Sequence, residues 1–182
     1  MLNLILTALF FVLPAYVANM MPVFFAKAGW LKVLGYPVDG GHKLGNQEIF
    51  GSHKTWRGLA AGTIGGIVTA LLLAGLSNLP FFNNLALLNY NHNWLVFGAL
   101  AGSGAILGDL IKSFFKRRVG IKPGSTWLVF DQLDFVFGFF LFTAVIIWPG
   151  WKIFVVACLA TLILHPLSNI LGKLLGLKKN WF

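Results

Sequence analysis

Residues 108–134 read GDLIKSFFKRRVGIKPGSTWLVFDQLD, with apolar sequence running up to this segment and resuming directly after it. The segment holds three of the five side-chain carboxylates in the 182-residue chain, at Asp109, Asp131 and Asp134. The basic residues between them are Lys112, Lys116, Arg117, Arg118 and Lys122. Ionisable groups at the ends of apolar segments are costly to remove from water, so they indicate a functional site. Carboxylates beside dense cations are typical of a divalent metal held next to phosphates.

The composition predicts a membrane protein. The chain is 58% hydrophobic and only 10% charged, with a mean hydropathy of +0.80, which excludes an ordinary soluble domain. Apolar runs of about 20 residues match the bilayer core at the rise of an α-helix. We therefore expect an all-α integral membrane fold, with a single membrane-embedded domain over residues 1–182 and a bundle of about five transmembrane helices. The expected helices span residues 4–25, 58–76, 94–111, 128–148 and 153–171.

Basic residues set the expected orientation. With these helices, thirteen of the fourteen Lys and Arg side chains fall on one side of the membrane and only Lys152 falls on the other. The positive-inside rule then places the N-terminus outside, and the C-terminus and the 108–134 segment on the cytoplasmic side of a multi-pass plasma-membrane protein. We expect the first apolar run to be retained as a helix, because no Lys or Arg precedes it and it is longer than a signal-peptide core. The net charge of +9 favours anionic partners, namely lipid headgroups and nucleotide phosphates, and we expect no nucleic-acid partner.

Two smaller patterns bear on the fold. The second apolar run contains Gly58, Gly62, Gly65 and Gly66, which predict a face where another helix packs closely. The single cysteine, Cys158, lies inside an apolar run, so the chain has neither an intramolecular disulfide nor a thiolate metal site.

The 108–134 segment places its charges on helical faces. One face is shared by residues spaced i, i+3, i+4 and i+7, namely Asp109, Lys112, Ser113 and Lys116. Asp131 and Asp134 are i and i+3 on the opening turn of the next helix, where the helix dipole favours their ionised form. The short connection predicts that the three carboxylates gather around one or two Mg²⁺ ions. The alternative is that the Asp pair only caps its helix and forms salt bridges with the basic loop.

Three further groups are candidates for the site. Lys54 and Arg57 stand at the mouth of the second helix beside glycines that let backbone amides approach phosphate, although a positive-inside anchor is the alternative. His165 and Asn169 lie one turn apart on the fifth helix, and His165 is either a site residue or a structural residue at a proline bend. Asn19 in the first helix either touches the site or bonds a neighbouring helix. The basic run 116–118 either enters the site or binds the anionic lipid surface.

Taken together, these motifs resemble a known family. Gly-Asp at 108–109, Ser-x-x-Lys-Arg at 113–117 and Asp-x-x-Asp at 131–134 resemble the pattern of integral-membrane CTP:phosphatidate cytidylyltransferases. Nearly the whole chain is more similar to the archaeal-type branch, the CDP-archaeol synthases. The motifs that carry this similarity are PAYVAN at 14–19, DGG at 39–41, KTWRG at 54–58, KPGS at 122–125, DQLD at 131–134 and GLK at 176–178. The chain departs from the phosphatidate branch in its shorter segment before DQLD and in Gln132, which bears on the lipid substrate more than on the reaction.

The resemblance implies a CTP-dependent nucleotidyl transfer in phospholipid biosynthesis. A phosphate oxygen of a membrane lipid, either archaeal-type unsaturated archaetidic acid or phosphatidate, attacks the α-phosphorus of CTP, and a CDP-activated lipid and pyrophosphate result. Asp109, Asp131 and Asp134 would hold Mg²⁺ and, with Lys116, form the catalytic group. The expected substrate-binding residues are Lys54, Arg57, Lys112, Ser113, Arg117, Lys122, Asn19, His165 and Asn169. A phosphate monoester is already anionic at neutral pH, so the reaction needs alignment and charge neutralisation instead of a general base.

Two rival functions have recognisable requirements. A secondary transporter for an anionic metabolite would show repeated halves and charges near the membrane midplane, whereas here the acids lie at helix ends and no repeat is evident. A CDP-alcohol phosphotransferase would need a D-G-x-x-A-R run after D-x-x-D, whereas Phe135 and Val136 follow Asp134. The sequence therefore favours the cytidylyltransferase.

Overall fold

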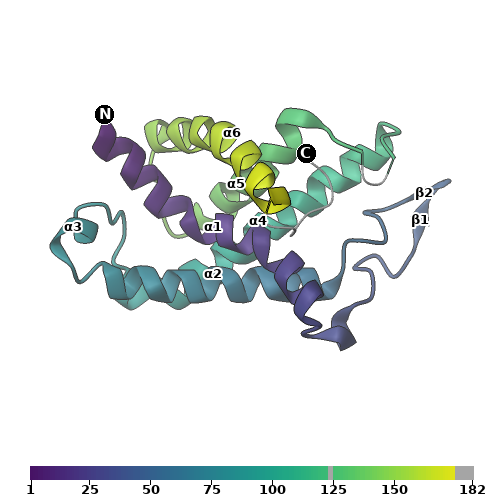
Figure 1. The fold of residues 1–182 in the computed structure, drawn as a ribbon, viewed down its shortest axis with the longest axis horizontal. Coiled ribbons are helices and arrows are strands. Elements are labelled where there is room, and N and C mark those ends of the chain that lie inside the picture. The colour runs from purple at the N-terminus through teal and green to yellow at the C-terminus, as the bar shows by residue number, and fades with distance from the viewer. Residues whose placement is uncertain (123–124, 175–182) are drawn as a thin grey trace.

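The computed structural model describes residues 1–122 and 125–174, with side chains up to residue 167 in the last helix. Helices dominate the described part (Figure 1). The elements in chain order are α1 (Leu2–Ala28), the 3₁₀ turn η1 (Lys32–Leu34), β1 (Lys43–Leu44), β2 (Gln47–Glu48), α2 (Trp56–Leu76), α3 (Pro80–Asn83), α4 (Tyr90–Arg118), α5 (Leu128–Thr143) and α6 (Trp151–Leu174). The two short strands pair antiparallel as a hairpin.

The predicted membrane bundle is confirmed. α1, α2 and α4 are long and apolar enough to cross a bilayer, and α6 is apolar over Trp151–Leu167. α5 has 16 residues and completes the five long helices expected from the sequence. The short α3 lies in the connection between α2 and α4.

Two predicted helix ends are wrong. α4 continues to Arg118 instead of stopping at 111, because its last turns carry Lys and Arg, which the negative end of a helix dipole favours. It stops where Gly120 adopts a left-handed φ of 79° and Ile121 donates its amide hydrogen to the Lys116 carbonyl, closing a Schellman motif. α5 ends at Thr143 instead of 148, ahead of a β-branched run and Pro149, both of which disfavour helix.

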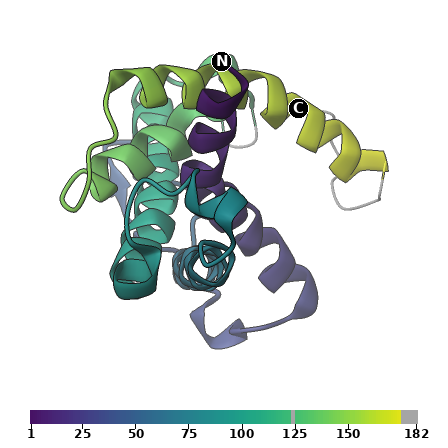
Figure 2. The same ribbon diagram turned by 90° about the vertical axis from the view of Figure 1, so that its left-hand side faces the viewer.

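Glycines set the close contacts between helices, as the sequence predicts for α2. α1 and α4 pack on α2 from either side (Figure 2). A Cβ atom at Gly66 of α2 would lie 2.6 Å from the Gly102 Cα of α4, so only glycine fits this crossing. α4 and α5 meet in the same way, since a Cβ at Gly138 would lie 2.8 Å from the Gly108 Cα. The second contact brings the acidic start of α5 against the charged end of α4.

Aromatic side chains fill the interior of the bundle between the helices. Phe11, Phe97 and Phe139 are fully buried, with ring centroids 5.2 to 6.0 Å apart. Ring pairs at this spacing bury large apolar areas, and the attraction between the edge of one ring and the face of another adds stability beyond that burial. The polar groups described below lie beyond this core, toward one end of the bundle.

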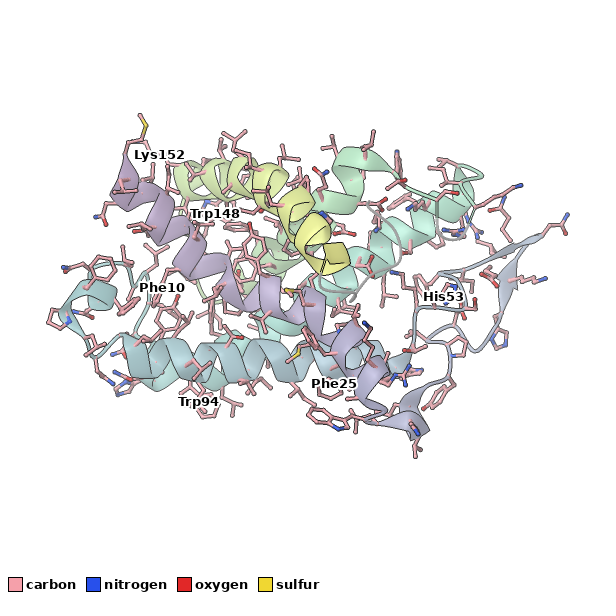
Figure 3. All side chains as sticks on the ribbon, in the orientation of Figure 1. Phe10, Phe25, His53, Trp94, Trp148 and Lys152 are labelled. Atoms are coloured by element: carbon pink, nitrogen blue, oxygen red, sulfur yellow. The ribbon has the colours of Figure 1, made fainter. Side chains whose placement is uncertain are left out.

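The two ends of the bundle differ in charge. The β1–β2 hairpin and the α4–α5 connection lie at one end, and α3 lies at the other (Figure 1). Lys152 sits at the α3 end and His53 sits in the loop at the hairpin end (Figure 3). Lys54, Lys112, Lys116 and Arg118 gather where the loop before α2 meets the end of α4, at the hairpin end. For these residues and Lys152, the structure agrees with the predicted segregation of charge.

Candidate active site

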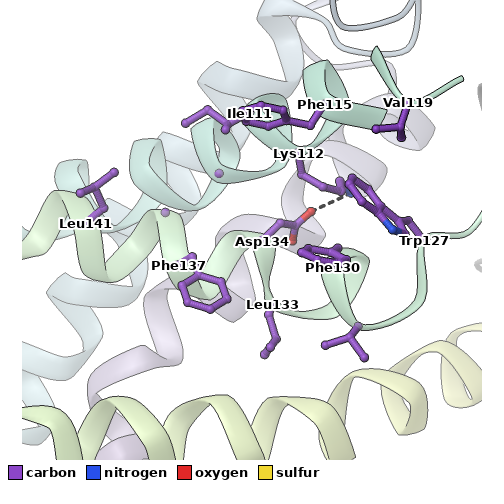
Figure 4. A pocket seen from close by; sticks show the side chains of 13 residues that line it. Ile111, Lys112, Phe115, Val119, Trp127, Phe130, Leu133, Asp134, Phe137 and Leu141 are labelled. Carbon is purple, nitrogen blue, oxygen red and sulfur yellow. Dashed lines mark ion pairs between the residues drawn. The ribbon is translucent and has the colours of Figure 1, made fainter. Parts of the chain in front are cut away.

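The Lys112 ammonium group is the centre of the charged cluster. Its Nζ lies 3.0 Å from Asp109 Oδ1, 2.7 Å from Asp131 Oδ1 and 2.7 Å from Asp134 Oδ2. Its side chain is only 13% exposed, so the cluster is largely removed from water. Figure 4 shows the pair that it forms with Asp134, between α4 and α5. The three predicted carboxylates thus converge, and they share one cation position.

Two more lysines complete the cluster. Lys54 Nζ lies 2.5 Å from Asp109 Oδ2, which ties the loop before α2 to α4. Lys116 Nζ donates to both carboxylate oxygens of Asp131 at 3.0 Å. Three ammonium groups therefore balance three carboxylates. An incoming polyanion has to draw these lysines away from their aspartates.

Local structure explains why the two aspartates of α5 point at α4. Asp131 lies in the first turn and accepts the amide hydrogen of Trp127 at 2.5 Å, so it caps the helix while it pairs with lysine. Asp134 lies one turn later, which corrects the prediction that both residues share the opening turn. A Cβ on Gly108 would meet the carbonyl of Asp134, so glycine is required for this approach. Asp131 therefore shows the contacts of the alternative interpretation, a helix cap with salt bridges to lysine, and its Mg²⁺ role stays a prediction.

The carboxylates fit a divalent cation in donor type and convergence. Among the described residues, no group of three His, Cys, Asp or Glu side chains is arranged as a ready metal site. The position that the three carboxylates share is taken by Lys112 Nζ. Carboxylate oxygens are preferred ligands of Mg²⁺. The three side chains are therefore candidates for holding Mg²⁺, at a position that Lys112 Nζ takes in this structure.

Asp39 organises the loop that carries Lys54. Its carboxylate accepts amide hydrogens from Gly41 and Phe50 at 3.0 Å and from Gly51 at 3.4 Å. Burial works against its ionisation, but these amides outweigh burial and lower the pKa of the Asp39 carboxyl below its usual range. Gly41 and Gly51 have positive φ values of 78° and 114°, which turn their amides toward the carboxylate. The DGG motif is therefore a loop-forming element.

Arg118 fastens this loop to α4. Its guanidinium donates to the Leu44 carbonyl at 3.2 Å and the Glu48 carbonyl at 2.7 Å, and it lies over the Phe114 ring. Thr55 then caps α2 by accepting the amide hydrogen of Gly58 at 3.2 Å. Sequence reasoning missed the roles of Asp39 and Arg118, because Asp39 acts on the backbone of its own loop and Arg118 acts on carbonyls at least 70 residues away. The DGG motif itself was the available signal for Asp39.

The other predicted site residues occupy varied positions. Ser113, Lys116 and Arg117 are buried on α4, at 3%, 7% and 7% exposure. Arg57 and Asn19 are half-buried on α2 and α1, and Lys122 is exposed after α4. His165 is half-buried on α6, with its ring centroid 6.2 Å from that of Phe135. The Asn169 side chain lies outside the described residues. For Arg57, Asn19 and Lys122, the described part of the chain records no ion pair with the cluster.

An apolar cavity of about 560 Å³ adjoins the cluster between α4 and α5. Aromatic rings form much of its wall, and Lys112 and Asp134 stand at its charged edge (Figure 4). The rings that line it belong to Phe115, Trp127, Phe130 and Phe137. Its volume falls in the range of small-molecule sites, about 300–1,000 Å³. The sequence did not predict this cavity, because it depends on how two helices diverge beyond their glycine contact.

The fold and the site together define a class: an intramembrane helical protein with a cluster of lysines and carboxylates beside an apolar cavity. The comparisons with known proteins are more specific. All 182 residues match the family model of CarS-like CDP-archaeol synthases. Two proteins named CDP-archaeol synthase, from Methanococcus aeolicus and Methanosarcina barkeri, are 33% and 36% identical to this chain. They cover 98% and 92% of it, and 97% and 98% of their own lengths.

A solved structure agrees with this result. It is described as an intramembrane enzyme for archaeal membrane lipids biosynthesis, and it is 32% identical, with a TM-score of 0.73. The match covers 90% of this chain and 92% of that one. The chain therefore belongs to the CDP-archaeol synthase family, and it is a multi-pass membrane enzyme, a CTP-dependent cytidylyltransferase that makes a CDP-activated lipid. This family sets aside the transporter and the CDP-alcohol phosphotransferase.

Proposed function

We propose that this enzyme joins CTP to unsaturated archaetidic acid, forming the CDP-activated archaeal lipid and releasing pyrophosphate. Its relatives named CDP-archaeol synthase come from archaea, which favours the ether lipid over phosphatidate. The observation that carries the proposal is the balanced cluster of three carboxylates and three lysines at the edge of an apolar cavity. Such a site suits the joining of a polyanion to a lipid headgroup.

The residues supply alignment and charge neutralisation. A lipid phosphate oxygen forms a bond to the α-phosphorus of CTP while the α–β phosphoanhydride bond breaks and its electron pair leaves with pyrophosphate. Lys54, Lys112 and Lys116 lie within 3.0 Å of carboxylates that they can exchange for phosphate oxygens. Positioned cations that meet developing phosphate charge lower the barrier without proton transfer. Arg57, Ser113 and the remaining predicted binding residues are assigned to the substrates by the sequence pattern.

Asp109, Asp131 and Asp134 are the residues that would hold Mg²⁺. The bound ion would supply charge neutralisation for the phosphates. The lysines of the cluster, once released, would be free to contact substrate oxygens, so the same residues serve both the ligand-free and the loaded site.

The cavity between α4 and α5 is our candidate for a hydrocarbon chain of the lipid. Its wall is apolar and aromatic, and its charged edge at Lys112 lies where the phosphate headgroup has to meet the cluster. A lipid bound in this way keeps its chain among apolar side chains and its phosphate beside a cation.

We also assign the site to the cytoplasmic face of the cell membrane. The support is the charge segregation, with Lys152 opposite the cations of the hairpin end. The positive-inside rule links such an excess of Lys and Arg to the cytoplasm. CTP would then reach the site directly.

The test is product formation by the purified protein in detergent. CTP and Mg²⁺ are supplied with unsaturated archaetidic acid or with phosphatidate, and mass spectrometry and pyrophosphate release are recorded. We expect the CDP-lipid from the archaeal substrate, and no product in EDTA. Asp109→Asn, Asp131→Asn and Asp134→Asn should each lower kcat by about 10²-fold or more, while Lys152→Gln at the other end should not. Melting temperatures on the same samples separate lost chemistry from lost folding. A preference for phosphatidate, or full turnover per folded molecule in the three variants, would refute the proposal.

A further inference from the structure

Arg117 is a buried cation without a partner among the described residues. It lies on α4, one turn beyond Ser113, and is only 7% exposed. Its Nε and Nη1 atoms are buried and have no hydrogen-bond partner. The neighbouring Arg118 also has a buried Nε without a recorded partner, but its two Nη atoms donate to backbone carbonyls.

The chain offers Arg117 no side-chain carboxylate. Its five acidic residues all lie in the described part, and each is already engaged. Asp39 and Glu48 accept backbone amides in the loop before α2. Asp109, Asp131 and Asp134 pair with the lysines of the cluster. Buried charges are normally paired because their desolvation is costly, so the unpartnered guanidinium of Arg117 suits an anion from outside the protein.

The position of Arg117 distinguishes two sources of phosphate. The α4 residues that line the apolar cavity are Gly108, Ile111, Lys112, Phe115 and Val119. Arg117 is not among them, and it lies about 200° around the helix from Phe115. A phosphate at Arg117 therefore lies off the side of α4 that faces the cavity.

We propose that Arg117 binds the phosphates of CTP that leave as pyrophosphate, an inference that rests on the proposed function. A guanidinium donates two parallel hydrogen bonds to a phosphate, and its planar fork fits this group better than an ammonium does. Lys54, Lys112 and Lys116 are held by carboxylates before substrate arrives, so Arg117 is the buried cation that is open to an anion in the ligand-free enzyme. The lysines join the phosphates after their ion pairs open.

The test compares two adjacent arginines. Thermal unfolding of the full chain in detergent is followed with and without inorganic pyrophosphate for the parent, Arg117→Met and Arg118→Met. Arg117→Met removes a buried unpaired charge, so its melting temperature without ligand should equal or exceed that of the parent, and its pyrophosphate-induced shift should vanish. Arg118→Met loses its carbonyl contacts, so it should melt earlier and keep the shift. A melting temperature that falls in Arg117→Met while the shift persists would overturn the assignment.

Kinetics assign the phosphate to its source. Arg117→Lys keeps the positive charge and so controls for a folding defect. It should raise KM for CTP by about tenfold or more and leave KM for the lipid phosphate unchanged. A rise confined to KM for the lipid phosphate would overturn the assignment to the nucleotide. If the parent binds pyrophosphate through Arg117 but forms no CDP-lipid, the anion site stands and the proposed function fails.

Discussion

Replacement of Lys112 by Met tests whether its ammonium group and a metal ion compete for one position. Lys112 is the one lysine that contacts all three carboxylates in the described structure. In Lys112→Met, Lys54 still pairs with Asp109 and Lys116 with Asp131. Asp134, with a side chain only 5% exposed, loses its sole recorded cation. The variant therefore leaves one buried carboxylate uncompensated at the centre of the site.

The expected loss follows from that uncompensated charge. Removal of one partner from a buried ion pair costs about 3–5 kcal/mol. For a domain of this size each kcal/mol corresponds to about 2–4 °C, so the melting temperature should fall by roughly 6–20 °C without divalent cations. Mg²⁺ no longer has to displace an ammonium group, so it should bind the variant more tightly than the parent. At a hundredfold excess over Kd, binding restores about 2.7 kcal/mol.

The assay is thermal unfolding in detergent over a Mg²⁺ titration, with Kd measured separately by calorimetry. Lys152→Met is the matched control, since Lys152 is an exposed lysine outside the cluster. Activity should be lost in Lys112→Met even when Mg²⁺ has restored its stability. Weaker Mg²⁺ binding by Lys112→Met than by the parent, or an unchanged melting temperature in EDTA, would show that Lys112 and Mg²⁺ do not compete for one position.

Three further predictions concern helix packing, the pH dependence of stability and the orientation in the membrane. Gly138→Ala places a Cβ 2.8 Å from the Gly108 backbone, so it should lower the free energy of unfolding by at least about 1–3 kcal/mol. It should also lower activity, because it separates Asp134 from Lys112. The control Gly75→Ala has open space around it and should be neutral or slightly stabilising. Because the folded-state pKa of Asp39 is lowered, its stabilising contribution is complete above about pH 4 and is lost as the pH falls through that lowered pKa. The difference in melting temperature between the parent and Asp39→Asn should therefore shrink in acid. A difference that grows in acid would contradict this account. In a Cys158→Ser background, Asn84→Cys should react with an impermeant thiol reagent applied outside the cell and Ser125→Cys should not, and the reverse pattern would invert the assigned orientation.

Several features were predictable because they depend on properties that are local in sequence. Hydropathy over 20-residue windows predicts membrane helices, since the bilayer imposes one length on every crossing. The spacing of Asp109, Lys112 and Lys116 fixes a common helical face, and the structure confirms that face. The end of α4 was misplaced because hydropathy falls at Lys112, whereas the helix continues into polar surroundings as far as Arg118. Hydropathy indicates where a helix leaves the apolar bilayer, whereas backbone hydrogen bonds and capping decide where the helix ends.

The sequence by itself therefore determined a membrane-embedded helical bundle, the gathering of its cations at one end and the set of residues that resembles a cytidylyltransferase site. Only the tertiary structure decided which of these residues meet. It placed the Lys112 ammonium among three carboxylates, gave Arg118 two carbonyl partners and left adjacent Arg117 without one in the part of the chain that it describes. It also opened an apolar cavity between α4 and α5. The physical reason is that ion pairing depends on distances between side chains from different helices, and helix crossings at Gly66 and Gly138 set those distances.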